Sequence, residues 1–124
     1  MGKSIAVKGC TVQDMTGGGT AKIESDPHAS IKCDGKNAYF GTVTVSVKGS
    51  NGGGFINNKN GQGVGTITGT GAKILGGSQP AVVEGDTGSV SVTGTNTVGN
   101  VTTTVTKTVT VRITAAGQAK VVAL

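Results

Sequence analysis

The chain has 124 residues and a mass of 12.1 kDa, enough for one domain and too little for two of ordinary size. Glycine fills 23 positions and aromatic residues make up only 2% of the chain. Each interior glycine costs a helix about 1 kcal/mol relative to alanine, so this composition disfavours a helix-rich fold. No stretch approaches the roughly 20 apolar residues of a membrane-spanning helix, and glycine lacks the three-residue period of collagen.

The net charge of +5 comes from basic residues that are spread along the chain rather than clustered. A phosphate-binding surface gathers lysine and arginine in one place and often adds aromatic rings for stacking. Arg112 is the only arginine, and aromatic residues are scarce. We therefore expect no specific nucleic-acid partner and assign the lysines to solubility and to the shielding of strand edges.

The first ten residues contain no apolar run long enough for a secretory signal. We expect the chain to be made in the cytoplasm without a signal peptide, and to leave, if it leaves, by a route that reads no such signal. The two cysteines, Cys10 and Cys33, permit one disulfide without requiring it. Reduced thiols are the expectation for a chain without a signal.

Alternating apolar and polar residues predict β-strands in three places along the chain. In 42–48 the valines share one side and the threonines, serine and lysine share the other, and 89–93 repeats this pattern. The longest run, 101–113, places its valines and Ile113 on odd positions, with Arg112 and five threonines (102, 104, 106, 108 and 110) on even ones. Each strand would turn one face to the core and the other to water or to a partner.

Glycine- and asparagine-rich stretches separate these runs and supply the backbone geometry of tight turns. They lie at 17–19, 49–54, 57–61 and 76–77. Since no segment shows a helical stripe of apolar residues, the chain is predicted to be all-β, with short strands. Its core would be thin and built from small residues, and we expect Tyr39, Phe40 and Phe55 to lie in it.

Two segments of the chain resemble each other at an offset of about 42–47 residues. The first is about 17–48 and the second about 63–93, and each begins on a Gly-Thr strand, passes through a glycine-flanked turn that contains alanine, and ends on alternating valines. One such unit is too small to bury a face, so the two are expected to pack against each other. We predict a single domain over 1–124, with 94–124 as a C-terminal strand extension.

The second unit carries a resemblance to a known family. It begins Gly65-Thr-Ile-Thr68 and continues to Pro80-Ala-Val-Val-Glu-Gly-Asp86. This pattern resembles the repeat of the PAAR family, with Pro80-Ala-Val-Val83 standing where the family has Pro-Ala-Ala-Arg, and the likeness covers roughly 17–92. PAAR proteins are the small tips of contractile injection machines. The resemblance therefore implies an all-β, cone-like PAAR-type fold built from two similar repeats.

A spike-tip structural protein is the function that this resemblance implies. The chain would be a monomer that caps a trimeric β-helical spike, of a type VI secretion system or a contractile phage tail, through the base of the cone. It would act on the target cell envelope as part of a virion tail or after secretion by a contractile system. On this hypothesis the C-terminal segment, with 96–113 as a hairpin or one long strand, lies toward the base and helps to dock the carrier. Its free edge would promote self-association without the partner.

Many PAAR tips hold zinc, often through a His-Gly pair before each Gly-Thr unit. At those places this chain has Thr16-Gly17 and Gln62-Gly63, which supply no zinc ligand. The remaining candidate ligands are Cys10, His28 and Cys33, with Asp26 or Asp34 as a fourth. These residue types suit tetrahedral zinc, but their spacing matches no zinc-ribbon pattern. We expect no cofactor, with zinc as the one metal that these residues would suit.

No set of residues fills the roles of an active site, and no enzymatic activity is expected. His28 is the only histidine, so a nucleophilic triad would have to combine it with Cys33 and Asp34. Glu84 and Asp86 fall on one side of a strand, as a glycosidase pair would. They lie at a Gly-Asp turn, however, which favours hydrogen bonds from the local backbone N–H groups to these carboxylates.

Two other functions stay open at this point. One is another structural virion protein, such as a capsid decoration or tail component, whose threonine face packs on neighbouring subunits. The other is an adhesive, carbohydrate-binding β-domain, which would normally show exposed aromatic platforms and an export signal. One chain per spike trimer would support the tip, whereas regular self-assembly would favour the decoration protein.

Overall fold

The computed structural model describes residues 3–29, 31–71, 79–118 and 122–123, and in these the chain is all-β, as predicted. None of them is helical, so this part of the chain holds no helix that could cross a bilayer. The predicted turn at 76–77 lies outside the described residues. The strands are β1 (Lys3–Ser4), β2 (Thr11–Asp14), β3 (Thr20–Ile23), β4 (Lys32–Cys33), β5 (Lys36–Asn37), β6 (Thr42–Ser50), β7 (Gly61–Thr68), β8 (Thr87–Val98), β9 (Val101–Ala115) and β10 (Val122–Ala123).

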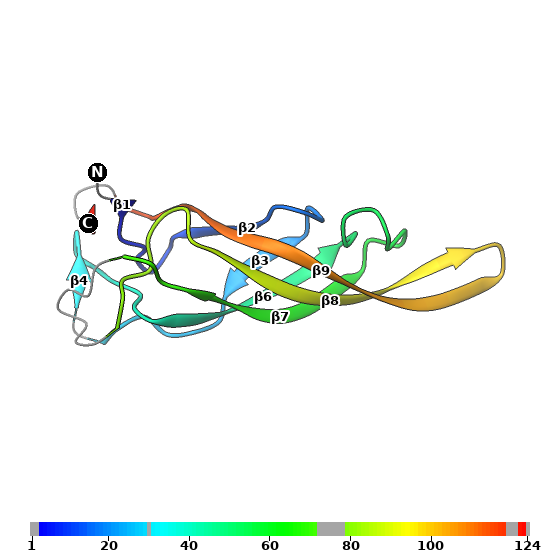
Figure 1. Cartoon of the computed structure of the whole chain (residues 1–124), viewed down its shortest axis with the longest axis horizontal. Coiled ribbons are helices and arrows are strands. Elements are labelled where there is room, and N and C mark those ends of the chain that lie inside the picture. Colours follow the sequence, from blue (N-terminus) through cyan, green and yellow to red (C-terminus); the bar gives the residue numbers. More distant parts are fainter. Residues whose placement is uncertain (1–2, 30, 72–78, 119–121, 124) are drawn as a thin grey trace.

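Six of the strands form one antiparallel sheet in the order β2-β9-β8-β7-β6-β3. The two outer strands, β2 and β3, come to lie beside each other without a shared ladder, so the sheet is a nearly closed barrel. Figure 1 shows an elongated body, with both termini, β1 and β4 at one end. The β8–β9 hairpin reaches out from the other end, in yellow and orange.

The two similar segments have the same strand connectivity. In the first, β3 pairs antiparallel with β6, and in the second β7 pairs antiparallel with β8. In each segment a long connection joins the two paired strands, over 24–41 in the first segment and over 69–86 in the second. The limit placed at 93 for the second segment falls inside β8, which continues to Val98.

The predicted alternation is confirmed in the parts of the three long strands that line the barrel, where apolar side chains at alternate positions are almost completely buried and most of the residues between them face outward. In 101–113 this holds from Val109 to Ile113, whereas Val101 is 62% exposed and Val105 only partly buried, because the hairpin extends beyond the barrel. The buried residues of these strands form most of the main core: Val43, Val45 and Val47 of β6, Val90 and Val92 of β8, and Val109, Val111 and Ile113 of β9.

The barrel is narrow because glycines let β8 approach β7 very closely. A Cβ atom on Gly63 would lie 1.8 Å from the Ser91 carbonyl oxygen, and one on Gly65 would lie 2.2 Å from that of Ser89. Both distances are shorter than any real contact, so a side chain at either position would force the two strands apart. The small core predicted from the composition therefore depends on these glycines as well as on valine.

The aromatic residues follow the prediction only in part. Tyr39 is buried in the main core and Phe40 is half-buried, but Phe55 is 59% exposed, so the prediction is wrong for Phe55. Phe55 belongs to the loop between β6 and β7. In this loop the next residue, Ile56, is the one whose side chain is buried in the core. The Phe55 ring lies under the Lys107 ammonium, whose Nζ is 3.9 Å from the ring centroid, a cation–π contact.

The Asp14 carboxylate organises the turn between β2 and β3. Its Oδ1 accepts hydrogen bonds from the backbone N–H groups of Thr16 (3.0 Å) and Gly17 (2.7 Å), and its Oδ2 accepts one from Gly19 (3.1 Å). Burial works to raise the pKa of Asp14, but these bonds and one from Ser50 outweigh it and lower the pKa below its ordinary value of 3.8. The ionised carboxylate thus holds β2 against β3 at this end of the barrel.

Replacing Asp14 with asparagine is expected to lower the free energy of unfolding by about 1–3 kcal/mol near neutral pH, because one acceptor oxygen becomes a donor that faces backbone N–H groups. The folded-state pKa lies below the unfolded one, so the stabilisation is present above pH 3.8 and is lost as pH falls through the lower, folded value. Urea unfolding at about pH 7 and about pH 2.5 would measure both effects. Asp26→Asn, at an exposed position, is the matched control. A deficit in Asp14→Asn that is equal at both pH values would contradict this account.

The C-terminal segment divides between the two ends of the molecule. Residues 96–113 form parts of a hairpin, with Val98 paired to Val101 at its tip, as one of the two predicted alternatives had it. The segment does not lie as a whole at one end, as was expected for the base, because the hairpin points away from the end that carries the termini (Figure 1). The end of the segment does return, since β10 pairs with β1.

Candidate docking site

Three separate stretches of backbone close the end of the barrel that lies near the termini. We call residues 4–8, 37–41 and 80–84 together the three-segment layer. Their central residues are joined in a ring: Ala6 donates its N–H to the carbonyl of Val82 (2.7 Å), Val82 to that of Tyr39 (3.0 Å), and Tyr39 to that of Ala6 (3.0 Å). Each segment thus donates to one neighbour and accepts from the other, which is the arrangement of a threefold axis.

A second set of hydrogen bonds repeats the same relation farther from the axis. In each segment, the residue two positions after the centre donates to the residue two positions before the centre of a neighbour. The three bonds are Lys8 N–H to Asn37 O (2.8 Å), Gly41 N–H to Pro80 O (2.7 Å) and Glu84 N–H to Ser4 O (2.9 Å). Three β-bridges agree with this: Ile5–Val83, Val7–Ala38 and Phe40–Ala81. The layer therefore has pseudo-threefold symmetry within one chain.

Side-chain alternation gives the layer two apolar faces. The three central side chains, Ala6, Tyr39 and Val82, belong to the main core of the barrel. The flanking side chains point the opposite way and form a second cluster with Cys33 of β4. Its layer residues are Ile5, Val7, Ala38, Phe40, Ala81 and Val83, two from each segment. This end of the barrel is therefore a rigid, doubly packed platform rather than a loop cluster.

Sequence comparison within the chain found two of the three segments and missed the first. The matched turns at Ala38 and Ala81 are equivalent positions of the layer, as their bridges show. The missed segment carried a usable signal: residues 5–9 read three apolar residues, a charged residue and glycine, as do 81–85. No Gly-Thr strand precedes this segment, so the pattern that marks the other two does not extend to it.

Short strand pairs and charged side chains lie around the layer at this end. β1 pairs with β10, and β4 pairs with β5 across a two-residue Asp34-Gly35 turn, where both residues have positive φ (53° and 78°), as a type I′ hairpin requires. Lys3, Lys32 and Lys36 are exposed on these pairs. The Lys36 ammonium donates to the carbonyl of Gly117 (3.0 Å), which ties β5 to the C-terminal segment.

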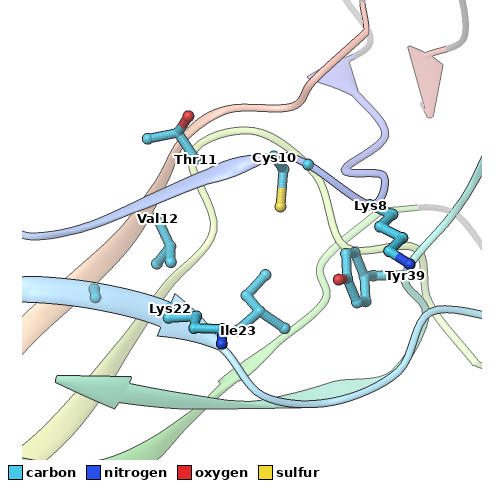
Figure 2. Close-up of a pocket in the computed structure, with 9 residues that line it drawn as sticks. Lys8, Cys10, Thr11, Val12, Lys22, Ile23 and Tyr39 are labelled. Atoms are coloured by element: carbon cyan, nitrogen blue, oxygen red, sulfur yellow. The ribbon is translucent and has the colours of Figure 1, made fainter.

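A groove marks the unclosed seam of the barrel. It has a volume of about 410 Å³ and lies between β2 and β3, bounded by Lys8 and Lys22. Figure 2 shows the Cys10 sulfur and the Ile23 side chain pointing into it, with Tyr39 at its inner end. Burial raises the pKa of the Cys10 thiol to about 11, so this cysteine is protonated and unreactive at neutral pH.

The structure does not bring the predicted zinc ligands together as one set. Cys10 packs on the main core, whereas Cys33 is buried in the second cluster, where burial also raises its pKa. His28 packs its ring edge-on to Phe40, with centroids 5.9 Å apart, and its Nδ1 accepts the Ile31 N–H (3.2 Å). Within the described residues, no three histidine, cysteine or acidic side chains are grouped to hold a metal. Zinc binding by these residues stays a prediction, and we derive no chemistry from it.

Both carboxylates near the Gly-Asp turn accept hydrogen bonds from the backbone, which is local, as predicted, for Asp86 but distant in the sequence for Glu84. Asp86 is buried and accepts the N–H of Val83 (2.9 Å) together with the backbone and hydroxyl of Thr70. Glu84 accepts the N–H of Ala116 (3.3 Å). Both groups hold the third segment of the layer in place, so their role in this structure is positional.

Compared with protein-family models, with curated proteins and with solved structures, the chain matches none of them.

Proposed function

We propose that this protein is a structural tip that docks through the three-segment layer onto the end of a trimeric, β-structured shaft, as PAAR-like tips do. The observation that carries the proposal is the pseudo-threefold symmetry of the layer. A single chain on the axis of a trimer meets three identical surfaces. The layer is buried between the two apolar clusters, so the contact itself would be made by the short strand pairs and charged side chains around it, held by a backbone frame that repeats three times around that axis.

The overall shape supports the same proposal. The layer is at the broad end, together with both termini, and the body narrows to the β8–β9 hairpin at the other end (Figure 1). A tip that transmits force along its axis needs a stiff connection at its base. Here the base consists of hydrogen-bonded backbone between two packed apolar clusters, which resists deformation.

The proposed docking end can be tested with charge-reversal variants. In Lys32→Glu/Lys36→Glu both changes lie beside the layer, on β4 and β5, whereas the matched control Lys48→Glu/Lys59→Glu alters charge toward the opposite end. The probe is a purified trimeric β-helical spike fragment, with binding followed by calorimetry. We expect the first variant to bind at least about tenfold more weakly than wild type and the control to bind like wild type. Equal loss in both variants, or loss only in the control, would place the contact elsewhere.

A further inference from the structure

The hairpin that extends beyond the barrel has two edges, and the chain covers only one of them. On the β8 edge, Asn57 acts like a neighbouring strand: its Oδ1 accepts the Thr97 N–H (2.9 Å) and its Nδ2 donates to the Thr97 carbonyl (2.8 Å). Asn60 Oδ1 accepts the Thr95 N–H (2.8 Å) in the same way. Asparagine side chains thus satisfy the β8 backbone where β7 no longer reaches it.

The register of the hairpin shows which residues form the other edge. The Thr110 carbonyl accepts the Met15 N–H (2.8 Å) and its N–H donates to Thr16 Oγ1 (3.0 Å), so the Thr110 backbone points away from β8. The β8–β9 ladder continues to the tip without a register shift, so every second residue of β9 points the same way. These residues are Thr102, Thr104, Thr106 and Thr108. Across the described parts of the chain, no strand pairs with β9 on this side beyond Thr110.

This edge lacks the features that normally prevent strand pairing. Residues 96–106 contain no charged residue and no proline, and they are rich in β-branched side chains. The nearest cation, Lys107, lies over the Phe55 ring rather than along the edge. At the tip, Val98 and Val101 are 75% and 62% exposed. A neutral, unpaired edge with exposed valines is a template on which another strand can pair.

We propose that the open edge of β9 pairs antiparallel with the same edge of a second copy of this chain. A twofold axis at Val105 would set Thr104 opposite Thr106 and Thr102 opposite Thr108, which pairs every open position. Two hairpins would then form one four-stranded sheet with an isologous interface.

The symmetry of the open positions about Val105 and their side-chain chemistry favour a second copy as the occupant. Each chain carries +5, which opposes association over most of the surface, but residues 96–106 carry no charge, and Lys107, within the proposed overlap, lies over the Phe55 ring. The threonine hydroxyls already pair across this hairpin, with Oγ1 atoms 3.0 Å apart in Thr93–Thr106 and 3.1 Å apart in Thr97–Thr102. The new interface would repeat this type of threonine pair. The dimer does not rest on the proposed tip function, because the hairpin and the three-segment layer lie at opposite ends.

Thr104→Pro is the deciding variant, because it removes an outward N–H without removing a bond of the β8–β9 ladder. Thr104→Ala keeps the N–H and is the matched control, and Thr104→Lys places like charges in the interface without any backbone change. Sedimentation equilibrium over a range of concentrations would follow the mass between 12.1 kDa and twice that value. Melting by circular dichroism at low concentration would check that each variant is folded.

We expect wild type and Thr104→Ala to dimerise, with Thr104→Pro and Thr104→Lys weaker by at least about tenfold in dissociation constant. Hydrogen exchange should show the Thr104 and Thr106 amides protected only in the dimer. Wild type that stays monomeric at every concentration would overturn the proposal, and so would Thr104→Pro and Thr104→Lys variants that dimerise like wild type. Assembly into open polymers would also overturn it, because a twofold interface closes at two copies.

Discussion

Replacing Gly63 with valine is expected to reduce the free energy of unfolding by about 4 kcal/mol or more, enough to leave much of the chain unfolded at room temperature. The added Cβ would lie 1.8 Å from the Ser91 carbonyl oxygen, which belongs to the backbone of β8 and cannot rotate away. The strands would have to separate, and the narrow main core between Val90 and Val47 would open to water.

Urea denaturation followed by far-ultraviolet circular dichroism would measure this loss. Thr66→Val is a suitable control, because it also introduces a valine into β7, but at a position where the side chain faces outward and is exposed. Its stability should lie within about 0.5 kcal/mol of wild type. A Gly63→Val protein as stable as this control would show that β7 and β8 do not approach as closely as described.

Replacing Val82 with aspartate should cost about 3–5 kcal/mol, because it buries a carboxylate with no partner at the centre of the three-segment layer. The Val82 side chain is fully buried and contacts the main core beside Ala6 and Tyr39. Part of the penalty would be relieved by protonation, so the variant should become relatively more stable as the pH falls toward the raised pKa of the buried acid.

The matched control for this change is Val64→Asp. Val64 is 62% exposed on β7, so the same substitution there should cost less than about 1 kcal/mol. Thermal melts of both variants at two pH values would separate the effects. If Val82→Asp melted at the same temperature as Val64→Asp, the layer would not be the packed structural unit described above.

The parts of the fold that the sequence predicts well are those with strict two-residue alternation. The buried valines of β6, β8 and β9 and the outward polar residues between them follow directly from the order of residues in 42–48, 89–93 and 109–113. Phe55 could not be placed in this way. Its position depends on where the β6–β7 link crosses the end of the barrel and on the contact with Lys107, more than fifty positions along the chain.

The candidate docking site was only partly predictable, for a related reason. Internal similarity pointed to the turns at Ala38 and Ala81, but not to the way they meet. The ring of hydrogen bonds also needs Ala6, from a segment that pairs with both turns although it lies far from each in the sequence. Such long-range backbone pairing leaves only a weak local signal, here three apolar residues followed by a charged residue and glycine.

The two ends of the molecule have different chemistry, and each end suggests a different contact. The layer end repeats three times around an axis and carries exposed lysines on β1, β4 and β5. At the other end, residues 96–106 of the hairpin carry no charge, and the hairpin has one open strand edge. A chain docked through the first end would keep the second exposed, so shaft binding and hairpin pairing can be measured independently.

Native mass spectrometry of the chain mixed with a trimeric β-helical spike fragment tests the central claim most directly, because it counts the chains on each trimer. The pseudo-threefold layer predicts that one chain of 12.1 kDa adds to three shaft protomers, and that excess chain does not increase this number. A complex with three chains per trimer, one on each protomer, would contradict the account, because the internal repetition of the layer would then have no threefold partner to match.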